Sequence, residues 1–349
     1  MAQTSRVGAI PPPLGVEPNF EDPENRNSLI YAVFAACLTV STACVALRLY
    51  TRFVSVKKHA TEDYLIICGY LFAVVYFSMM PLGIQYGAGT HLWDMTPEKA
   101  MDFAKRSNMT DVIYSVTTCF VKLSIVAQIY HIFVPHRALK SKLFWVLLVT
   151  GALTIAFYTA CVFYRIFACT PREKIWNTRI VGKCINQEAA ILNSAVFNTA
   201  FDFLVLFIPM QSIWVLRMST RKKIGVSMIF AVGFIACVFS IMRTIASIPI
   251  LKSKDLTWNL IPVGAWCDAE IAAGIVCCCL PVCPQFYRSN ISPLVTSLKS
   301  LRSRRGSYMR DSENPELPPS DRRWSEPDKD KIGVAASEVT TELSERRSV

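Results

Sequence analysis

Seven long apolar runs between Leu29 and Cys283 limit what this chain of 349 residues can fold into. A helix of about 17 to 25 mainly apolar residues crosses the hydrocarbon core of a bilayer, and all seven runs are long enough. Backbone polar groups in lipid must hydrogen-bond within their own segment, so each run is expected to be a helix. We therefore predict an all-α fold, a seven-transmembrane helix bundle over residues 29–283. The runs are residues 29–50, 64–85, 109–133, 143–168, 190–216, 224–251 and 261–283.

Composition agrees with a membrane protein and argues against a nucleic-acid-binding one. Hydrophobic residues make up 52% of the chain and charged residues only 18%, which is unusual for a soluble domain. The net charge of +11 is spread over short loops and the C-terminal region and forms no basic face interleaved with aromatic residues. The chain has four histidines, in no pattern typical of a metal site. We expect membrane lipid, and no nucleic acid or metal, as partners.

The charges around the first run predict the orientation of the chain. Acidic residues precede this run and basic residues follow it, and cytoplasmic flanks are the ones enriched in Lys and Arg. Residues 1–28 should therefore lie outside the cell, and seven spans then place the C-terminus in the cytosol. We expect the plasma membrane as the location. The flanking charges are Glu17, Glu21, Asp22 and Glu24 before the run, and Arg48, Arg52, Lys57 and Lys58 after it.

The C-terminal region is expected to have two parts. In residues 284–305, apolar side chains recur at helical spacing beside Lys299, Arg302, Arg304 and Arg305, which predicts a basic amphipathic helix on the inner membrane surface. Residues 306–349 are rich in Ser, Pro, Glu and Arg, which predicts a disordered cytosolic tail. Ser307 and Ser325 each follow a pair of arginines, so we predict that both are phosphorylated.

Two of the thirteen cysteines differ from the rest in their surroundings. Eleven lie inside apolar runs, where a thiol packs as a small apolar group. Cys169 and Cys184 instead lie in one polar loop, and the predicted orientation exposes that loop to the oxidising side of the membrane. We predict a disulfide between Cys169 and Cys184.

Four charged residues lie too deep in the runs to reach a membrane surface: Lys122, Asp202, Arg243 and Glu270. Counting about 1.5 Å of rise per residue places all four about 12 to 18 Å below the predicted outer ends, in one layer. Two cations and two anions make that layer neutral, as expected if an unpaired ion costs about 2.5 to 3.5 kcal/mol there. Two interpretations remain open, a ligand-binding site or a buried network that only fixes helix packing.

Short motifs in these runs point to a known family. They are Arg48-x-Tyr50-x-Arg52, Glu62-Asp63, Lys122-Leu123-Ser124 with Tyr130, Cys169-x-Pro171 with Trp176 and Cys184, Asn198 with Asp202, Pro209 with Trp214, Arg243, and Trp266, Glu270, Cys279-Leu280-Pro281 and Pro284. With them the chain resembles the fungal rhodopsin-domain family, which includes Pth11-like receptor candidates and the membrane protein of the satratoxin cluster. The resemblance covers about residues 15 to 290. The family usually has paired Asp where this chain has Glu62-Asp63.

The resemblance implies a receptor-like membrane protein that senses an unknown small ligand and passes the signal to a cytosolic protein. The alternative is a transporter or a membrane-embedded, terpene-cyclase-like enzyme of a fungal secondary-metabolite pathway, in which Glu270 or Asp202 moves a proton. Against a carrier, the seven runs show no duplicated pattern. Against the enzyme, two matched bases would keep both acids ionised. No catalytic residue is assigned.

The family name also raises the question of retinal. Retinal attachment requires a lysine amine that forms a Schiff base. The last run contains no lysine, and Lys122 in the third run is the single deeply placed one. Since nearby acids would keep that amine charged, we expect a receptor without retinal or any other cofactor.

Overall fold

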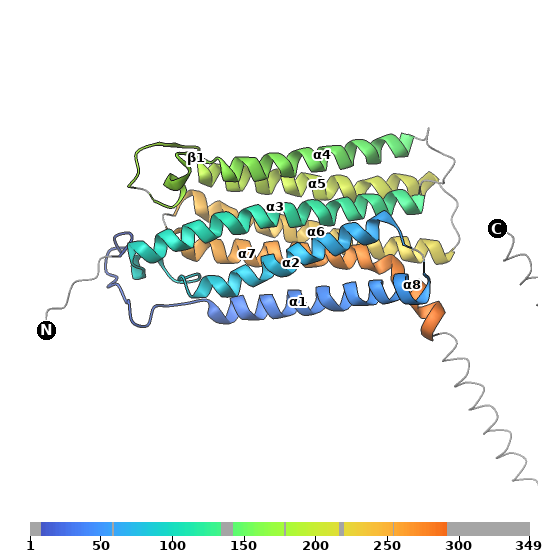
Figure 1. Cartoon of the computed structure of the whole chain (residues 1–349), viewed down its shortest axis with the longest axis horizontal. Helices are drawn as coiled ribbons and strands as arrows, with labels where there is room; N and C mark the ends of the chain where they lie inside the picture. The colour runs from blue at the N-terminus through green and yellow to red at the C-terminus, as the bar shows by residue number, and fades with distance from the viewer. Residues whose placement is uncertain are drawn as a thin grey trace, which may run out of the picture. The chain divides into compact units, whose positions relative to one another are not determined.

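The computed structural model describes residues 8–57, 59–133, 142–177, 179–215, 220–253 and 255–291. Seven helices in this part are long and apolar enough to cross a membrane, which confirms the expected fold class (Figure 1). They are α1 (Asn27–Leu49), α2 (Thr61–Ile84), α3 (Pro97–Phe133), α4 (Lys142–Ile166), α5 (Gln187–Val215), α6 (Thr220–Ser247) and α7 (Leu256–Cys279). We call the end of the bundle where α1, α3, α5 and α7 begin the outer end, following the predicted orientation.

Shorter elements extend or join these helices. A π-helical segment, Tyr50–Ser55, continues α1, and 3-10 turns cover Leu92–Asp94, Arg172–Ile175 and Ile248–Leu251. After α7 come a 3-10 turn (Leu280–Val282), α8 (Cys283–Phe286) and a π-helical segment (Tyr287–Ile291). Residues 292–349 lie outside the described residues, and with them most of the expected amphipathic helix and both predicted phosphorylation sites, Ser307 and Ser325.

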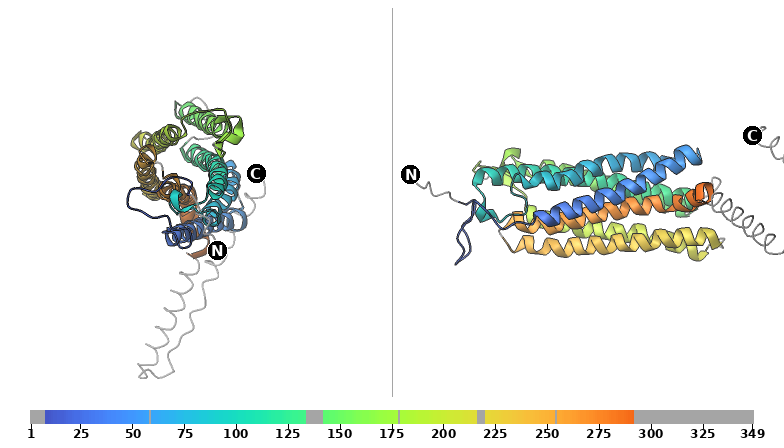
Figure 2. Two further views of the ribbon diagram at one scale, coloured as in Figure 1. Left: turned by 90° about the vertical axis from the view of Figure 1, so that its left-hand side faces the viewer. Right: turned by 90° about the horizontal axis from the view of Figure 1, so that it is seen from below.

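Helices α3 and α7 occupy the interior of the bundle (Figure 2). α3 contacts α2, α4, α5 and α7, and α7 contacts α1, α2, α3 and α6. In their most apolar stretches 50% of the α3 residues and 67% of the α7 residues are buried, against 22% for α1 and for α4. A Cβ atom on Gly274 of α7 would lie 2.7 Å from Cγ1 of Val121 on α3. The two inner helices therefore approach this closely because a glycine stands at the contact.

The distribution of polar side chains is the reverse of that in a soluble protein. Large apolar side chains such as Leu71, Val149 and Phe197 point outward, whereas the interior holds fully buried polar ones such as Thr117 and Thr154. An outward apolar surface is favourable in lipid, and interior hydroxyls find partners on the turn before them. Thr154 Oγ1, for example, donates to the carbonyl oxygen of Thr150 at 2.8 Å. The bundle is thus built for a lipid surrounding.

Helix α3 begins twelve residues earlier than the apolar run predicted, at Pro97 rather than Met109. Thr96 precedes it, and its hydroxyl accepts from the backbone N–H of Lys99 at 3.4 Å. Proline suits the first helical position because its missing N–H would have no partner there. The first turns are too polar to register as an apolar run, so the prediction missed them. They carry the arginine and serine side chains at the entrance of the site described below.

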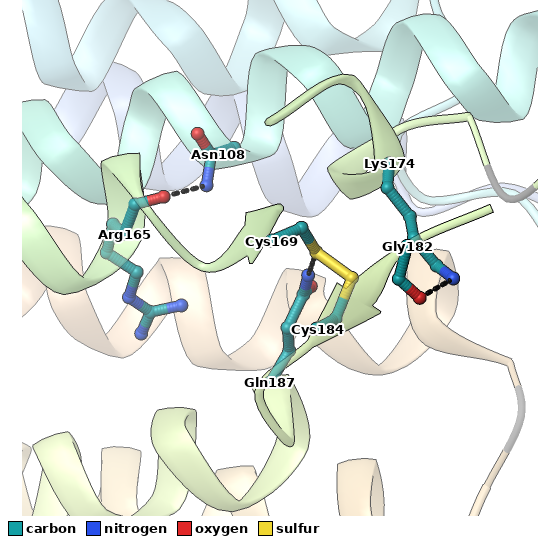
Figure 3. The surroundings of a disulfide bond; sticks show 7 residues. All are labelled: Asn108, Arg165, Cys169, Lys174, Gly182, Cys184 and Gln187. Atoms are coloured by element: carbon teal, nitrogen blue, oxygen red, sulfur yellow. Dashed lines mark hydrogen bonds between the residues drawn. A yellow bond between two sulfur atoms is a disulfide. The ribbon is translucent and has the colours of Figure 1, made fainter. Parts of the chain in front are cut away.

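A small hairpin closes the outer end between α4 and α5. β1 (Cys169–Thr170) pairs antiparallel with β2 (Lys183–Cys184), with the two cysteines directly opposite each other. The predicted disulfide joins them. Figure 3 shows Gln187, at the start of α5, donating to the sulfur of Cys169, and Asn108 of α3 donating to the carbonyl oxygen of Arg165 at 3.0 Å. The first bond fixes the hairpin to α5, and the second joins α3 to the end of α4 from which the hairpin begins.

We expect a membrane-impermeant thiol reagent to label the hairpin on intact cells only after reduction. The predicted orientation places both sulfurs outside, and the disulfide occupies both thiols until it is broken. Mass spectrometry of the peptides that contain Cys169 and Cys184 measures the labelling. Equal labelling with and without reductant would contradict the bond. Labelling that requires permeabilised cells would contradict the orientation.

Candidate functional site

Lys122 of α3 and Asp202 of α5 form a tight, buried ion pair. Lys122 Nζ lies 2.8 Å from Asp202 Oδ1, and the two side chains are 5% and 12% exposed. The same ammonium donates to Asn198 Oδ1 at 3.0 Å and to the Asn198 carbonyl oxygen at 3.2 Å. All three N–H groups of Lys122 therefore have an acceptor, as a buried ammonium requires.

Arg243 of α6 and Glu270 of α7 form a second, looser pair. Arg243 Nε lies 3.5 Å from Glu270 Oε2, too far for a good hydrogen bond, and neither atom has another hydrogen-bond partner. The hydroxyl of Tyr114 on α3 bridges them, since it accepts from Arg243 Nη1 and donates to Glu270 Oε1. A pair held through a bridging hydroxyl has room to tighten or to separate.

Asn198 joins the two ion pairs into one network. Its side-chain nitrogen lies within hydrogen-bonding distance of Asp202 Oδ2 (3.1 Å) and Glu270 Oε1 (2.8 Å), and its side-chain oxygen accepts from Lys122 and from the Tyr158 hydroxyl. The network carries two cations and two anions and has no net charge. We call this set the central network: Tyr114, Lys122, Tyr158, Asn198, Asp202, Arg243 and Glu270.

The structure thus brings together all four charged residues expected from the sequence. Asn198 was visible only as a motif position. Neither Tyr114 nor Tyr158 could be singled out from the sequence, because tyrosine is common in membrane helices and finds a hydrogen-bond partner in many settings. Asp268, two residues before Glu270, lies outside the network. It is fully buried, and neither of its carboxyl oxygens has a hydrogen-bond partner.

A cavity lies on the outer side of the central network, and we call it the outer cavity. It contains about 1070 Å³ of empty space, including its open mouth. Asn198, Arg243, Tyr114 and Tyr158 line one end of it. Its walls are mostly apolar and aromatic, and its polar entrance comes from α3 and α4. The wall and entrance residues include Tyr76, Met79, Met80, Phe103, Phe157 and Leu260, and Arg106, Ser107, Asp111 and Arg165.

The structure divides the four charged residues, which the sequence placed in one layer, between two cavities. Arg243 lines the outer cavity, whereas Lys122, Asp202 and Glu270 line a second one of about 680 Å³. The second cavity also involves Ile129, which lies deeper along α3. The network therefore separates the two spaces, since its members face one or the other. Counting residues along a helix gives depth but not the direction in which a side chain points.

A second buried network lies toward the inner end of the bundle. The side chain of Arg48 on α1 is fully buried, and its Nε and Nη2 lie 2.8 and 2.7 Å from Asp63 Oδ1 of α2. Its Nη1 donates to Gln128 Oε1 of α3 at 2.7 Å and to the carbonyl oxygen of Cys278 on α7. One guanidinium therefore ties α1, α2, α3 and α7 together. The sequence suggested Arg48 only as a flanking charge and as part of a motif.

Two neighbours complete this inner network. Arg52 lies 3.7 Å from Asp63 Oδ1 and 3.7 Å from Glu62 Oε1. The carbonyl oxygen of Glu62 accepts from Ser124 of α3 at 3.0 Å. The Arg48-x-Tyr50-x-Arg52 and Glu62-Asp63 motifs are thus two halves of one ion-pair cluster. Because α3 and α7 contribute to both networks, a movement of either helix would affect both.

Comparison with known proteins identifies the family. The family model for the fungal rhodopsin domain matches residues 47–289, which include both networks and the hairpin. The chain belongs to the fungal rhodopsin domain family. The resemblance inferred from the motifs is confirmed. Since the match begins at residue 47, Arg48 is among the first residues of the domain.

Relatives of this fungal rhodopsin-domain protein include a biosynthesis cluster protein, a SAT4 family membrane protein and a receptor. Fugralins biosynthesis cluster protein 2 of Gibberella zeae is 31% identical over 284 residues, covering 80% of this chain and 70% of the relative. The SAT4 family membrane protein of Emericella nidulans is 36% identical over 220 residues, 63% of this chain and 55% of the relative. Receptor GIN3 of Arthrobotrys oligospora is 22% identical over 262 residues, 74% of this chain and 62% of the relative.

The residues of this rhodopsin-domain chain do not fit retinal. Helix α7 contains no lysine. The one lysine in the central network, Lys122, has its ammonium bonded to Asp202 and twice to Asn198. A Schiff base would require this amine to lose those acceptors and would leave Asp202 without its cation. Membership of this family therefore does not imply a retinal chromophore at this site.

Proposed function

We propose that this chain is a seven-helix receptor of the plasma membrane that binds a small ligand in the outer cavity without retinal. The observation that carries the proposal is that one end of the outer cavity is made by the central network. A ligand seated there would touch Tyr114 and Arg243, whose partner Glu270 lies on α7. Helices α3 and α7 continue to the inner network around Arg48, so a ligand-dependent shift has a physical route to the cytosolic side.

The name of the relative Receptor GIN3 agrees with a signalling role. In this proposal the inner loops and the C-terminal region contact a cytosolic signalling protein. The looser Arg243–Glu270 pair is the part of the network that responds, because its two atoms at 3.5 Å can approach or separate with little loss. The tight Lys122–Asp202 pair holds α3 and α5 in place during that change.

A second candidate is a transporter or membrane enzyme of secondary metabolism, and the relationship to Fugralins biosynthesis cluster protein 2 favours it. The position of the central network between two cavities also suits a carrier. Acid catalysis is less well supported. Asp202 is held by Lys122 and Glu270 lies beside Arg243, and neither carboxyl group lines the outer cavity in which a substrate would be seated.

The test compares the gene deletion, the wild type and two variants of α3 in the host fungus. Ser107→Trp should block the outer cavity at its entrance, where Ser107 lines the wall. Lys105→Trp is the matched control, since Lys105 lies about half a helical turn away and is exposed. Both proteins should reach the plasma membrane as fluorescent fusions. We expect Ser107→Trp to reproduce the transcriptional change of the deletion and Lys105→Trp to behave as wild type.

The two candidates differ in what the deletion changes. A receptor alters transcript levels in response to compounds in the medium. A transporter or enzyme leaves transcripts unchanged and causes one metabolite to disappear or to accumulate inside the cell. Paired RNA sequencing and metabolite profiling of the same cultures would therefore decide between them, and unchanged transcripts would contradict the receptor proposal.

A further inference from the structure

The lining of the outer cavity carries an excess of positive charge. The side chains of Arg106, Arg165 and Arg243 line the cavity, and Asp111 is the acidic residue among its lining. Arg243 is matched by Glu270, and Arg165 Nη1 is paired with Asp111 Oδ2 at 2.8 Å. Within the described part of the chain, Arg106 forms no ion pair with a carboxylate.

Arg106 is nonetheless held in a defined position. Its guanidinium lies over the ring of Tyr86, 3.6 Å from the ring centre, a contact that orients an arginine without neutralising it. The entrance therefore presents one unmatched cation on α3, Arg106, and one weakly matched cation on the facing α4, Arg165. The Asp111 side chain is 39% exposed, so its pair with Arg165 contributes little stability and can be exchanged.

A third space, distinct from the two cavities described above, leads to this entrance from the outer surface. It contains about 1370 Å³ of empty space, including open solvent, and shares Phe103, Ser107, Asp111 and Arg165 with the outer cavity. Trp176 of the loop between the two strands also lines it. The Arg165–Asp111 pair thus stands where the two spaces meet, and a ligand from outside would pass it.

Beyond the charged entrance the walls become apolar. Met79 and Met80 of α2 lie between the entrance and the central network, and Phe157 of α4 lines the cavity beside the network residue Tyr158. The flexible thioether side chains adapt to apolar surfaces of different shapes, and the aromatic ring offers a large apolar contact area. A molecule that satisfies both regions carries an anionic group at one end and an apolar body at the other.

We propose that the outer cavity binds an amphipathic organic anion, a carboxylic acid with an apolar chain or ring system. The carboxylate is bound by Arg106 and Arg165, and replaces Asp111 on Arg165, while the apolar body lies against Met79, Met80 and Phe157. A planar guanidinium can hold a carboxylate through two parallel hydrogen bonds. The inference names the ligand class for the proposed receptor site and rests on the outer cavity being that site.

The experiment uses the full chain in lipid nanodiscs and three probes of equal length: decanoate, decylamine and decanol. We expect decanoate to bind saturably, with an affinity on the order of tenfold higher than that of decylamine or decanol. Empty nanodiscs measure partition into lipid. Ser107→Trp, which blocks the entrance, should abolish the saturable component.

Charge variants then locate the anion. Arg106→Gln should weaken decanoate on the order of tenfold, because one charge-assisted contact is lost. Asp111→Asn should tighten it by roughly threefold, because the competing carboxylate is gone. Lys105→Gln removes an equal charge from the same helix but outside the cavity lining, and should change the affinity less than about twofold.

Two results would overturn the inference. One is equal affinity for the three probes with no effect of Arg106→Gln. The other is the absence of saturable decanoate binding. Neither decides the receptor proposal, which the transcript response of the Ser107→Trp strain tests independently. Conversely, the expected charge pattern with unchanged transcripts would support the anion site and contradict the receptor.

Discussion

Replacement of Lys122 by methionine is expected to destabilise the folded protein by about 3 to 5 kcal/mol. The change removes the cation from a pair whose side chains are 5% and 12% exposed and leaves Asp202 buried without a counter-charge. It also leaves the side-chain oxygen of Asn198 with one donor fewer. Since native proteins are stable by only about 5 to 15 kcal/mol, the yield of folded protein in detergent should fall sharply. Size-exclusion chromatography and thermal unfolding measure the loss.

The double variant Lys122→Met/Asp202→Asn tests whether the loss comes from the stranded charge. An asparagine side chain in place of the aspartate would carry no charge and would keep an oxygen to accept from Asn198. We expect the double variant to recover much of the stability, and the double-mutant cycle gives the coupling energy directly. Asp268→Asn is the matched control, a buried carboxyl with no hydrogen-bond partner, and should change stability little. Additive losses in the cycle would show that Lys122 and Asp202 are not coupled.

The sequence predicts the helices and the depth of the buried charges, but not their connections. Seven helices follow from the apolar runs because lipid permits few other structures. The helical rise is constant, so residue counting places Lys122, Asp202, Arg243 and Glu270 at similar depth. Which cation faces which anion depends on how each helix is rotated, and no local pattern encodes that rotation. The role of Asn198 depends on the same rotations.

At Arg48 the sequence does not reveal that the side chain is buried. An arginine at the end of an apolar run normally extends to the membrane surface, and its charge then indicates orientation. Here its side chain is fully buried, because it bonds to partners on other helices. Two of these partners, Gln128 and Cys278, lie 80 and 230 residues away in the chain. Contacts between residues so far apart cannot be seen from one segment. In the sequence the inner network shows only as separate short motifs, Arg48-x-Tyr50-x-Arg52 and Glu62-Asp63 among them.

Replacement of Arg48 by methionine is expected to cost about 3 to 5 kcal/mol, as for Lys122. Asp63 would keep its bond from the backbone N–H of Ala60 but would lose the two close guanidinium nitrogens. The carbonyl oxygen of Cys278 and the side chain of Gln128 would each lose a donor in a dry interior. Buried acceptors without donors carry a desolvation penalty of about 1 to 3 kcal/mol each.

Arg48→Lys separates charge from geometry at this position. Lysine keeps the positive charge, but its three N–H groups share one nitrogen on a shorter side chain, whereas Arg48 reaches Asp63, Gln128 and Cys278 through separate nitrogens of a wider planar group. We therefore expect Arg48→Lys to recover only part of the loss. Arg52→Lys is the matched control in the same motif. Arg52 lies 3.7 Å from both carboxylates and makes no close hydrogen bond to them that lysine would lose, so this change should cost at most about 1 kcal/mol. Thermal unfolding measures the loss of stability in both variants. Equal losses for Arg48→Lys and Arg52→Lys would mean that positive charge, rather than the planar guanidinium of Arg48, holds α1, α2, α3 and α7 together.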